Sequence, residues 1–269
     1  MGALSSLAEL RTRPARLMRI GLGTGAVLLV IAVWQLFTWG APEERWISPV
    51  TLPSPGEVVA SVESLFTERG LVKGISATIW RVVLGFGLAI AVGVPLGVLA
   101  GTWRGIDAFA APLSLFGRNI PIAALIPLTV LWFGTENYQK VMFIFIATVP
   151  FVFGTAAEAV IKVKDRYVET ALTLGASRGQ VFRKVLVPLA MPSIFTGVRI
   201  LFGLAFGYLM LAEAINAKHG LGHLIMTSQR RGMNEHIYVI LLVIGLIAYG
   251  IDRLLFYIEE TLFPYREKS

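Results

Sequence analysis

The sequence contains no cysteine and few charged residues. Only 15% of its 269 residues carry charge, whereas soluble globular domains carry about 25%. The absence of cysteine excludes disulfides, zinc sites with thiolate ligands and thiol catalysis. The low charge argues against a soluble enzyme, and an apolar content of 55% excludes a disordered chain.

Long apolar runs take the place of charge. Mean hydropathy is +0.71, and six runs are long enough for a spanning helix, which needs about 20 apolar residues. We therefore expect an all-α membrane protein with six transmembrane helices. The expected spans are 20–39, 75–101, 109–133, 141–161, 193–214 and 237–257. The first run exceeds the apolar part of a signal peptide, about 7–15 residues, so we expect it to remain as a helix.

The third expected span is interrupted by Pro112, Pro121 and Pro127. Each proline removes a backbone donor, and broken helices at membrane depth need neighbouring protein or a water-filled cavity. This span is therefore expected in the bundle interior or along a path.

Basic residues predict the orientation of the spans. With a cytoplasmic N-terminus, fourteen lysines and arginines fall in inner segments and seven in outer ones, and positive residues favour the cytoplasm. Both termini are therefore expected to be cytoplasmic, which explains the net charge of +7 without nucleic acid.

The same reasoning predicts the domain organisation. It consists of a cytoplasmic segment 1–19, a transmembrane domain 20–257 and a cytoplasmic tail 258–269, with outer loops 40–74 and 215–236 and a cytoplasmic loop 162–192. The first outer loop contains Pro53 and Pro55 followed by apolar residues at helical spacing, which predicts a short interfacial helix.

The cytoplasmic loop is too long for a simple connection, which usually runs about 4–6 residues. A first helix is expected over 165–174, with Asp165 as its cap and Gly175 as its end. Ser177 and Gln180 have capping-box spacing and predict the start of a second helix.

Apolar residues form one stripe on this second helix, which we expect Pro188 and Pro192 to end. The stripe consists of Val181, Phe182, Val185 and Leu186. Two interpretations remain open. The loop is either a helix–glycine–helix knob that docks on a partner, or a solvated tether between two spans.

The spacing within the loop resembles the EAA loop of ABC-importer permeases, in which E-A-A is followed after three residues by G and after nine more by I-x-L-P. The corresponding residues are Glu169, Thr170, Ala171, Gly175, Val185, Val187 and Pro188. Thr170 replaces an alanine, Val185 an isoleucine and Val187 a leucine, which are mild departures.

Further motifs between about residues 50 and 250 resemble the nitrate, sulfonate, taurine and bicarbonate branch of that family. They are Leu52-Pro53-Ser54-Pro55, Thr78-Ile79-Trp80-Arg81, Asn119-Ile120-Pro121, Ile126-Pro127-Leu128, Trp132-Phe133-Gly134 and Gly220-Leu221-Gly222.

The resemblance implies a type I ABC-importer permease fold in a bacterial inner membrane and a transport subunit rather than an enzyme. Two permease subunits, expected as a homodimer, form the path within membrane lipid. Two cytoplasmic ATPase subunits accept the loops, and an extracytoplasmic binding protein delivers the substrate. The expected coupling residues are Glu169, Thr170, Ala171, Gly175, Val185 and Pro188.

The implied mechanism is alternating access driven by ATP on the partner subunits. Mg-ATP is expected on the ATPase subunits, and this chain is expected to bind no cofactor and no metal. Consistently, the sequence lacks the G-x-x-x-x-G-K-[ST] phosphate loop. The implied substrate is a small anion such as nitrate, bicarbonate, a sulfonate or taurine.

Polar residues at membrane depth are costly and often functional. Arg118, Asn119 and Arg199 are candidates for the translocation path, because a guanidinium fork matches the geometry of oxyanions. The favoured alternative is that both arginines pair with carboxylates or with helix ends to hold the bundle. Arg81 is expected to snorkel to the outer surface, and Glu158 to pair with the lysine one helical turn on.

All three histidines, His219, His223 and His236, fall in or beside the 215–236 loop. Two are four residues apart, a possible metal spacing, but the pattern offers no third ligand. We therefore expect a docking surface for the binding protein rather than a metal site.

Two other classes of function remain as alternatives. An ion-gradient-driven secondary carrier often shows matched discontinuous helices in its two halves, but the broken third span has no such counterpart. A membrane enzyme would need a nucleophile–base pair or a metal set at membrane depth, and no histidine or cysteine lies within the expected spans.

Overall fold

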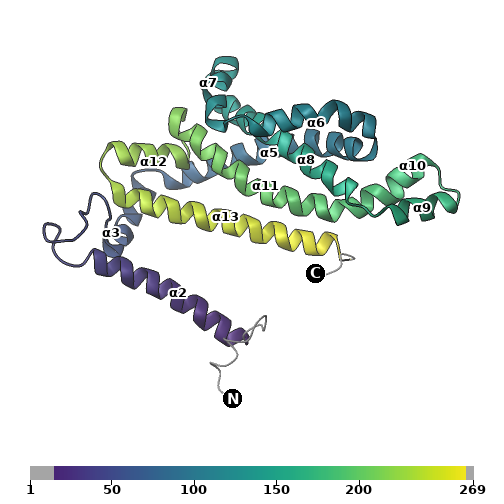
Figure 1. Ribbon diagram of the computed structural model, residues 1–269. Helices are drawn as coiled ribbons and strands as arrows, with labels where there is room; N and C mark the ends of the chain where they lie inside the picture. The colour runs from purple at the N-terminus through teal and green to yellow at the C-terminus, as the bar shows by residue number, and fades with distance from the viewer. Residues whose placement is uncertain (1–14, 265–269) are drawn as a thin grey trace. The chain divides into compact units, whose positions relative to one another are not determined.

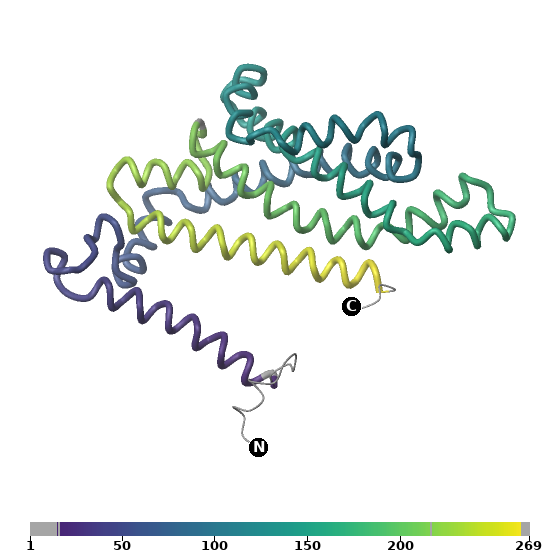
Figure 2. The backbone as a smooth tube through the Cα atoms, viewed as in Figure 1, coloured from purple at the N-terminus to yellow at the C-terminus, as the bar shows by residue number. Residues whose placement is uncertain are grey.

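The computed structural model describes residues 15–264, apart from the side chains of Arg16 and Asn216, and the regular elements in this range are all helices (Figures 1 and 2). They are α2 (Arg16–Phe37), α3 (Pro55–Ala60), α4 (Val62–Thr67), α5 (Leu71–Thr102), α6 (Arg104–Asn119), α7 (Ile122–Phe133), α8 (Asn137–Ile161), α9 (Asp165–Thr173), α10 (Arg178–Val181), the π-helical turn η1 (Phe182–Leu186), α11 (Val187–Asn216), α12 (Leu221–Arg230) and α13 (Asn234–Leu262). Most of the expected segment 1–19 and the last part of the tail 258–269 lie outside the described residues.

The prediction of an all-α membrane protein is confirmed. Within the described range, five helices are long and apolar enough to cross a membrane, and the bent pair of α6 and α7 makes a sixth candidate span. Each expected span coincides with one of these helices. The helices extend a few residues beyond most of the predicted ends, because helical hydrogen bonding continues into the polar flanks.

The chain forms two compact units, and the smaller one contains residues 15–64 and 228–239 of the described range. The short helix expected after Pro53 and Pro55 is present as two helices, α3 in this unit and α4, which begins in it. A capping box begins α3: the Ser54 amide donates to the Glu57 carboxylate at 2.7 Å, and the Glu57 amide donates to Ser54 Oγ. The pKa of the Glu57 carboxyl lies below its usual value, mainly because Arg45 donates a hydrogen bond to it at 3.0 Å.

Aromatic contacts hold the other parts of this unit together. Trp34 Nε1 of α2 donates to the Pro53 carbonyl at 2.9 Å, and the Trp34 ring stacks on Tyr238 of α13 with centroids 5.9 Å apart. The Tyr238 hydroxyl in turn donates to the Thr51 carbonyl at 3.0 Å. The proline-containing segment before α3 is therefore held by hydrogen bonds from both α2 and α13.

In the larger unit, residues 65–227 and 240–264, α5 packs directly along α8. Four glycines of α5 face α8, and a Cβ at any of them would lie less than 3.0 Å from an α8 atom. They are Gly85, Gly93, Gly97 and Gly101. Spacings of four and eight residues place them on one helix face, and small residues permit the close backbone approach that stabilises helix pairs in lipid. We call this contact the glycine seam.

The third span is broken once rather than three times. Helices α6 and α7 meet at an angle of 102°, and Pro121 stands at the break as the residue before α7. Pro112 and Pro127 lie inside helices, so the prediction that they break the span is wrong. Tolerance of prolines within membrane helices fits the ability of neighbouring helices and side chains to satisfy the freed carbonyls.

The fifth span begins further back than predicted. Pro188 and Pro192 do not end the second loop helix, because a continuous helix runs from Arg178 to Ile215. The turn η1 explains this: the Val187 amide donates to the Phe182 carbonyl, five residues back. The hydrogen-bond register changes at this π-helical turn, and Pro188, which has no amide proton, follows immediately.

The glycine seam makes a direct prediction. Gly97→Leu forces a side chain against the Phe153 backbone and Ala156, and overpacking of this kind costs about 1–3 kcal/mol or more. We expect a lower melting temperature and less monodisperse protein in mild detergent. Gly87→Leu is the matched control, since no atom lies within 4 Å of a Cβ at Gly87. Equal melting temperatures for the two variants would contradict the close contact between α5 and α8 at Gly97.

Candidate functional site

The loop at 162–192 ends its first helix, α9, with a glycine turn. Gly175 has φ +84°, its amide donates to the Leu172 carbonyl at 2.9 Å, and the Ala176 amide donates to the Ala171 carbonyl at 3.0 Å. These two bonds form a Schellman motif, which requires the left-handed conformation that glycine adopts freely. The predicted helix stop at Gly175 is present.

The start of α9 differs from the prediction. Lys164 occupies the cap position, and no side chain caps the helix end. Asp165 is instead the first helical residue, where its charge interacts favourably with the positive end of the helix dipole. The prediction of Asp165 as the cap is therefore wrong by one residue.

The second loop helix begins as predicted. Ser177 and Gln180 form a full capping box, with bonds of 2.8 and 3.4 Å. Of the apolar stripe, Val181 is buried, and Phe182 and Leu186 pack against a core cluster of α5, α8 and α11 residues. The Phe182 ring also lies 5.1 Å from that of Trp103, which follows α5. The root of the loop is thus part of the helical bundle.

The tip of the loop is exposed. Figures 1 and 2 show α9 and α10 projecting beyond the ends of α8 and α11. Glu169 and Thr170 are exposed and Ala171 is half-buried. Leu174 is 82% exposed. It is a candidate contact residue that was not predicted from the sequence, although its position beside the helix-ending Gly175 is a recognisable signal.

The last two expected coupling residues lie behind this tip. Val185 is half-buried in η1, and Pro188 is exposed as the second residue of α11. They belong to the helix that continues into the fifth span.

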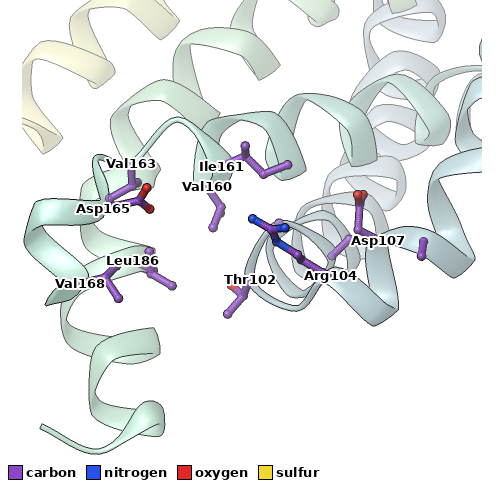
Figure 3. Close-up of a pocket in the computed structure, with 12 residues that line it drawn as sticks. Thr102, Arg104, Asp107, Val160, Ile161, Val163, Asp165, Val168 and Leu186 are labelled. Atoms are coloured by element: carbon purple, nitrogen blue, oxygen red, sulfur yellow. The ribbon is translucent and has the colours of Figure 1, made fainter. Parts of the chain in front are cut away.

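A cavity of about 530 Å³ lies between the loop and the bundle (Figure 3). Figure 3 places Asp165 and Val168 of α9 on one side, and Arg104 and Asp107 of α6 on another. The remaining lining comes from the ends of α5 and α8, from Ala108 of α6, from Val163 after α8 and from Leu186. Because of this space, the inner face of α9 is not packed against α6.

At the opposite end of the bundle, a buried ion pair joins α5 to α11. Arg81 Nη1 lies 2.6 Å from Glu213 Oε1, and their side chains are 4% and 0% exposed. The prediction that Arg81 snorkels to the surface is therefore wrong. Burial of a charge at this depth requires a close partner with further hydrogen bonds, and Glu213 is that partner.

Further donors complete this cluster. Thr78 Oγ1 donates to Glu213 at 2.8 Å, and the Gly222 amide does so at 3.1 Å. Arg81 also donates to the Asn137 side chain at 2.6 Å and to the His219 carbonyl at 2.6 Å. The cluster therefore holds the segment before α12 against the starts of α5 and α8. We call it the Arg81–Glu213 cluster.

Arg199, a candidate for the path, pairs with α13. Its Nη1 lies 2.9 Å from Glu259 Oε2, and its Nε lies 3.2 Å from Asp252 Oδ1. Phe256, between these carboxylates on the same helix face, lies under the guanidinium at 5.1 Å. This arrangement matches the structural alternative that the sequence favoured for Arg199.

Arg118 and Asn119 lie at the end of α6, beside the break in the third span. The Asn119 side chain donates to the Leu115 carbonyl at 2.7 Å. The Arg118 guanidinium lies against Gly154 of α8, and no carboxylate of the described chain pairs with it.

The remaining predicted polar groups have diverse partners. Glu158 pairs with Lys162 at 3.4 Å as predicted. His236 Nε2 lies 2.9 Å from Ser64 Oγ, and His219 is exposed. The described part of the chain contains no group of three or more potential metal ligands. Lys218, hydrogen-bonded to Glu136 at 3.0 Å, lowers the pKa of that carboxyl.

Comparison with known proteins identifies the family. Residues 93–262 match the model of the "Binding-protein-dependent transport system inner membrane component" family. The chain therefore belongs to this family, as a permease subunit of a binding-protein-dependent ABC importer. Family membership implies an ATPase and a substrate-binding protein as partners, and a multi-pass location in the inner membrane.

Individual relatives cover nearly the whole chain. A probable ABC transporter permease protein of Brucella abortus is 33% identical over 256 residues, which cover 95% of this chain and 99% of the relative. The taurine transport system permease protein TauC of Escherichia coli is 31% identical, covering 93% and 91%. The nitrate import permease protein NrtB of Synechocystis sp. is 28% identical, covering 90% and 89%.

Solved structures confirm the type I importer fold. A chain of the MetNI methionine ABC transporter superposes with a TM-score of 0.61 at 22% identity, covering 71% of this chain and 95% of that one. A chain of an amino acid ABC transporter gives a TM-score of 0.60 at 20% identity, covering 73% and 97%.

The Arg81–Glu213 cluster can be tested by unfolding. Arg81→Ala leaves the Glu213 carboxylate buried without its cation, which typically costs about 3–5 kcal/mol. We expect a large fall in melting temperature of the detergent-solubilised protein. Lys162→Ala removes a pair whose side chains are 75% and 59% exposed, and such surface pairs contribute about 0–1 kcal/mol. Equal effects of the two substitutions would contradict the structural role of Arg81.

Proposed function

We propose that this permease imports a small anion by alternating access and that its 162–192 loop couples this motion to cytoplasmic ATPase subunits. In this assignment Glu169, Thr170, Ala171 and Gly175 form the contact surface. Val185 and Pro188 lie on the helix that transmits its displacement. Mg-ATP binds to the partner ATPase subunits, and this chain performs no bond-making step.

The observation that carries the proposal is the continuous helix from Arg178 to Ile215. One end of it belongs to the exposed loop, and the rest forms the fifth span. A helix transmits a displacement along its axis more directly than a flexible connection would, because its backbone hydrogen bonds fix the geometry. A movement imposed on the loop therefore reaches the membrane-spanning part of the bundle.

The loop tip has the chemistry of a docking surface. Leu172 is 48% exposed and Leu174 82% exposed, beside the exposed carboxylate of Glu169. Apolar side chains at the centre and charged groups at the rim are typical of protein interfaces. A tip of this kind fits a groove on the ATPase subunits.

The cavity behind α9 supports a moving loop. A volume of about 530 Å³ separates its inner face from the α5–α6 turn. Close-packed interiors resist displacement, so this space lets α9 shift relative to α6 while Phe182 and Leu186 hold the root.

Orientation, assembly and substrate complete the proposal. The excess of basic residues in the inner segments supports cytoplasmic termini and a cytoplasmic 162–192 loop. A homodimer supplies the second half of the path. The names of TauC and NrtB, taurine and nitrate permeases, support a small sulfonate or nitrogen oxyanion as substrate, with bicarbonate as a further candidate.

Substitution of Gly175 tests the coupling. Gly175→Val forces a β-branched residue into a left-handed conformation, which costs about 1–2 kcal/mol, although the space around Gly175 is open. We expect distortion of the loop tip and therefore lower import of taurine or nitrate per ATP hydrolysed in proteoliposomes that contain the complete importer.

The matched control is Gly175→Asn, since asparagine tolerates the left-handed region. It should retain most of the import per ATP. The two variants are compared at equal amounts of assembled complex. If import per ATP is the same for both, Gly175 has no role in coupling.

A further inference from the structure

The end of α6 is fixed against α8 at a narrow crossing. Ser114 Oγ donates to the Pro150 carbonyl at 2.9 Å. A Cβ at Gly117 would lie 2.7 Å from Pro150 Cγ, so the two helices are in direct contact there. The following residue, Arg118, therefore leaves the backbone at a well-defined place beside the break between α6 and α7.

A glycine on α8 makes room for the Arg118 head group. A Cβ at Gly154 would lie 2.9 Å from both Cζ and Nη1 of Arg118. The guanidinium thus lies on the bare backbone of α8, and its Nε is buried without a hydrogen-bond acceptor. Any side chain larger than glycine at this position would displace the cation.

Arg118 differs from Arg81 and Arg199 in how its charge is compensated. Arg81 is paired with Glu213, and Arg199 with Asp252 and Glu259. Throughout residues 15–264, by contrast, Arg118 has neither an ion pair nor a hydrogen bond. The neighbouring Asn119 side chain, not Arg118, occupies the Leu115 carbonyl near the end of α6.

Arg118 lies in the last turn of α6, where the negative end of the helix dipole offsets only part of its charge. A cation within a span that has no ion pair is costly, so its retention calls for a negative partner. A guanidinium presents a planar fork of donors that matches the oxygens of carboxylates, sulfonates and nitrate. We infer that Arg118 is an anion-binding residue of the translocation path, where a single small oxyanion neutralises it as it passes. This inference rests on the proposed import of a small anion and names the group that contacts it.

The geometry also assigns a role to Arg199. Its two carboxylate partners already satisfy its charge, so it holds α11 to α13 and does not contact the anion. The sequence suggested the same role for Arg118 and Arg199, whereas the structure distinguishes them by their partners. The two arginines therefore serve as a matched pair in an experiment.

The absence of cysteine permits a charge-restoration test. The complete importer, with Arg118→Cys or Arg118→Gln in the permease, is reconstituted in proteoliposomes, and uptake of taurine, nitrate and methanesulfonate is measured. We expect both variants to lower uptake at least about tenfold, the scale of one hydrogen bond to a charged group. Aminoethyl methanethiosulfonate, which adds a cation to the introduced thiol, should restore part of the uptake. The sulfonatoethyl reagent, which adds an anion, should not restore uptake. The control is the unsubstituted permease treated with each reagent.

The amount of folded permease separates binding from structure. Arg118→Gln should leave it unchanged, because no carboxylate loses its partner, whereas Arg199→Gln should lower it. Unchanged uptake in Arg118→Gln would overturn the inference, and so would a loss of folded protein equal to that of Arg199→Gln. If the unsubstituted importer takes up none of the three solutes, each of which carries an oxyanion group, the proposed substrate class fails and the inference fails with it. If it takes them up and the Arg118 variants do so equally well, only the inference fails.

Discussion

Close packing of α5 on α8 is the constraint on which the larger unit depends. Four glycines of α5 bring the two helices so close that a Cβ at any of these four positions would collide with α8. Lipid offers no hydrophobic gain for helix association, so contact area and backbone proximity must supply it. With this pair fixed, α6 crosses α8 at Pro150, and α11 packs beside α5 and α8. The root of the loop packs into the core that α5, α8 and α11 form.

Three arginines of the larger unit differ in how their charge is compensated. The Arg81–Glu213 cluster uses a buried ion pair to hold the segment before α12, and Arg199 joins α11 to α13. Arg118 is left without a partner among the described residues. Paired charges fix helices, since separating them exposes an uncompensated charge. The unpaired one is available to a ligand. The loop at the other end of α11 provides the contact through which, in our proposal, ATP hydrolysis drives the bundle.

Local patterns predicted most of the fold. Apolar run length located the spans, Pro121 marked the bend, and Gly175 and the Ser177–Gln180 pair marked the loop helices. Features that depend on distant residues could not be predicted. Arg81 and Glu213 are 132 residues apart, so their pairing becomes visible only when α5 and α11 meet. The helix continues past Pro188 because a π-helical turn changes the hydrogen-bond register, which proline counting does not foresee.

The proposed coupling requires the 162–192 loop to bind an ATPase subunit. The most direct test is purification of the tagged permease from its native membranes in mild detergent, with mass spectrometry of the proteins that accompany it. We expect an ATPase subunit to co-purify with the permease. This subunit should be lost when Glu169 and Gly175 are both substituted while the permease remains folded. Recovery of a stable permease alone, able to move solute without ATP, would rule out this coupling and support an ion-gradient-driven carrier.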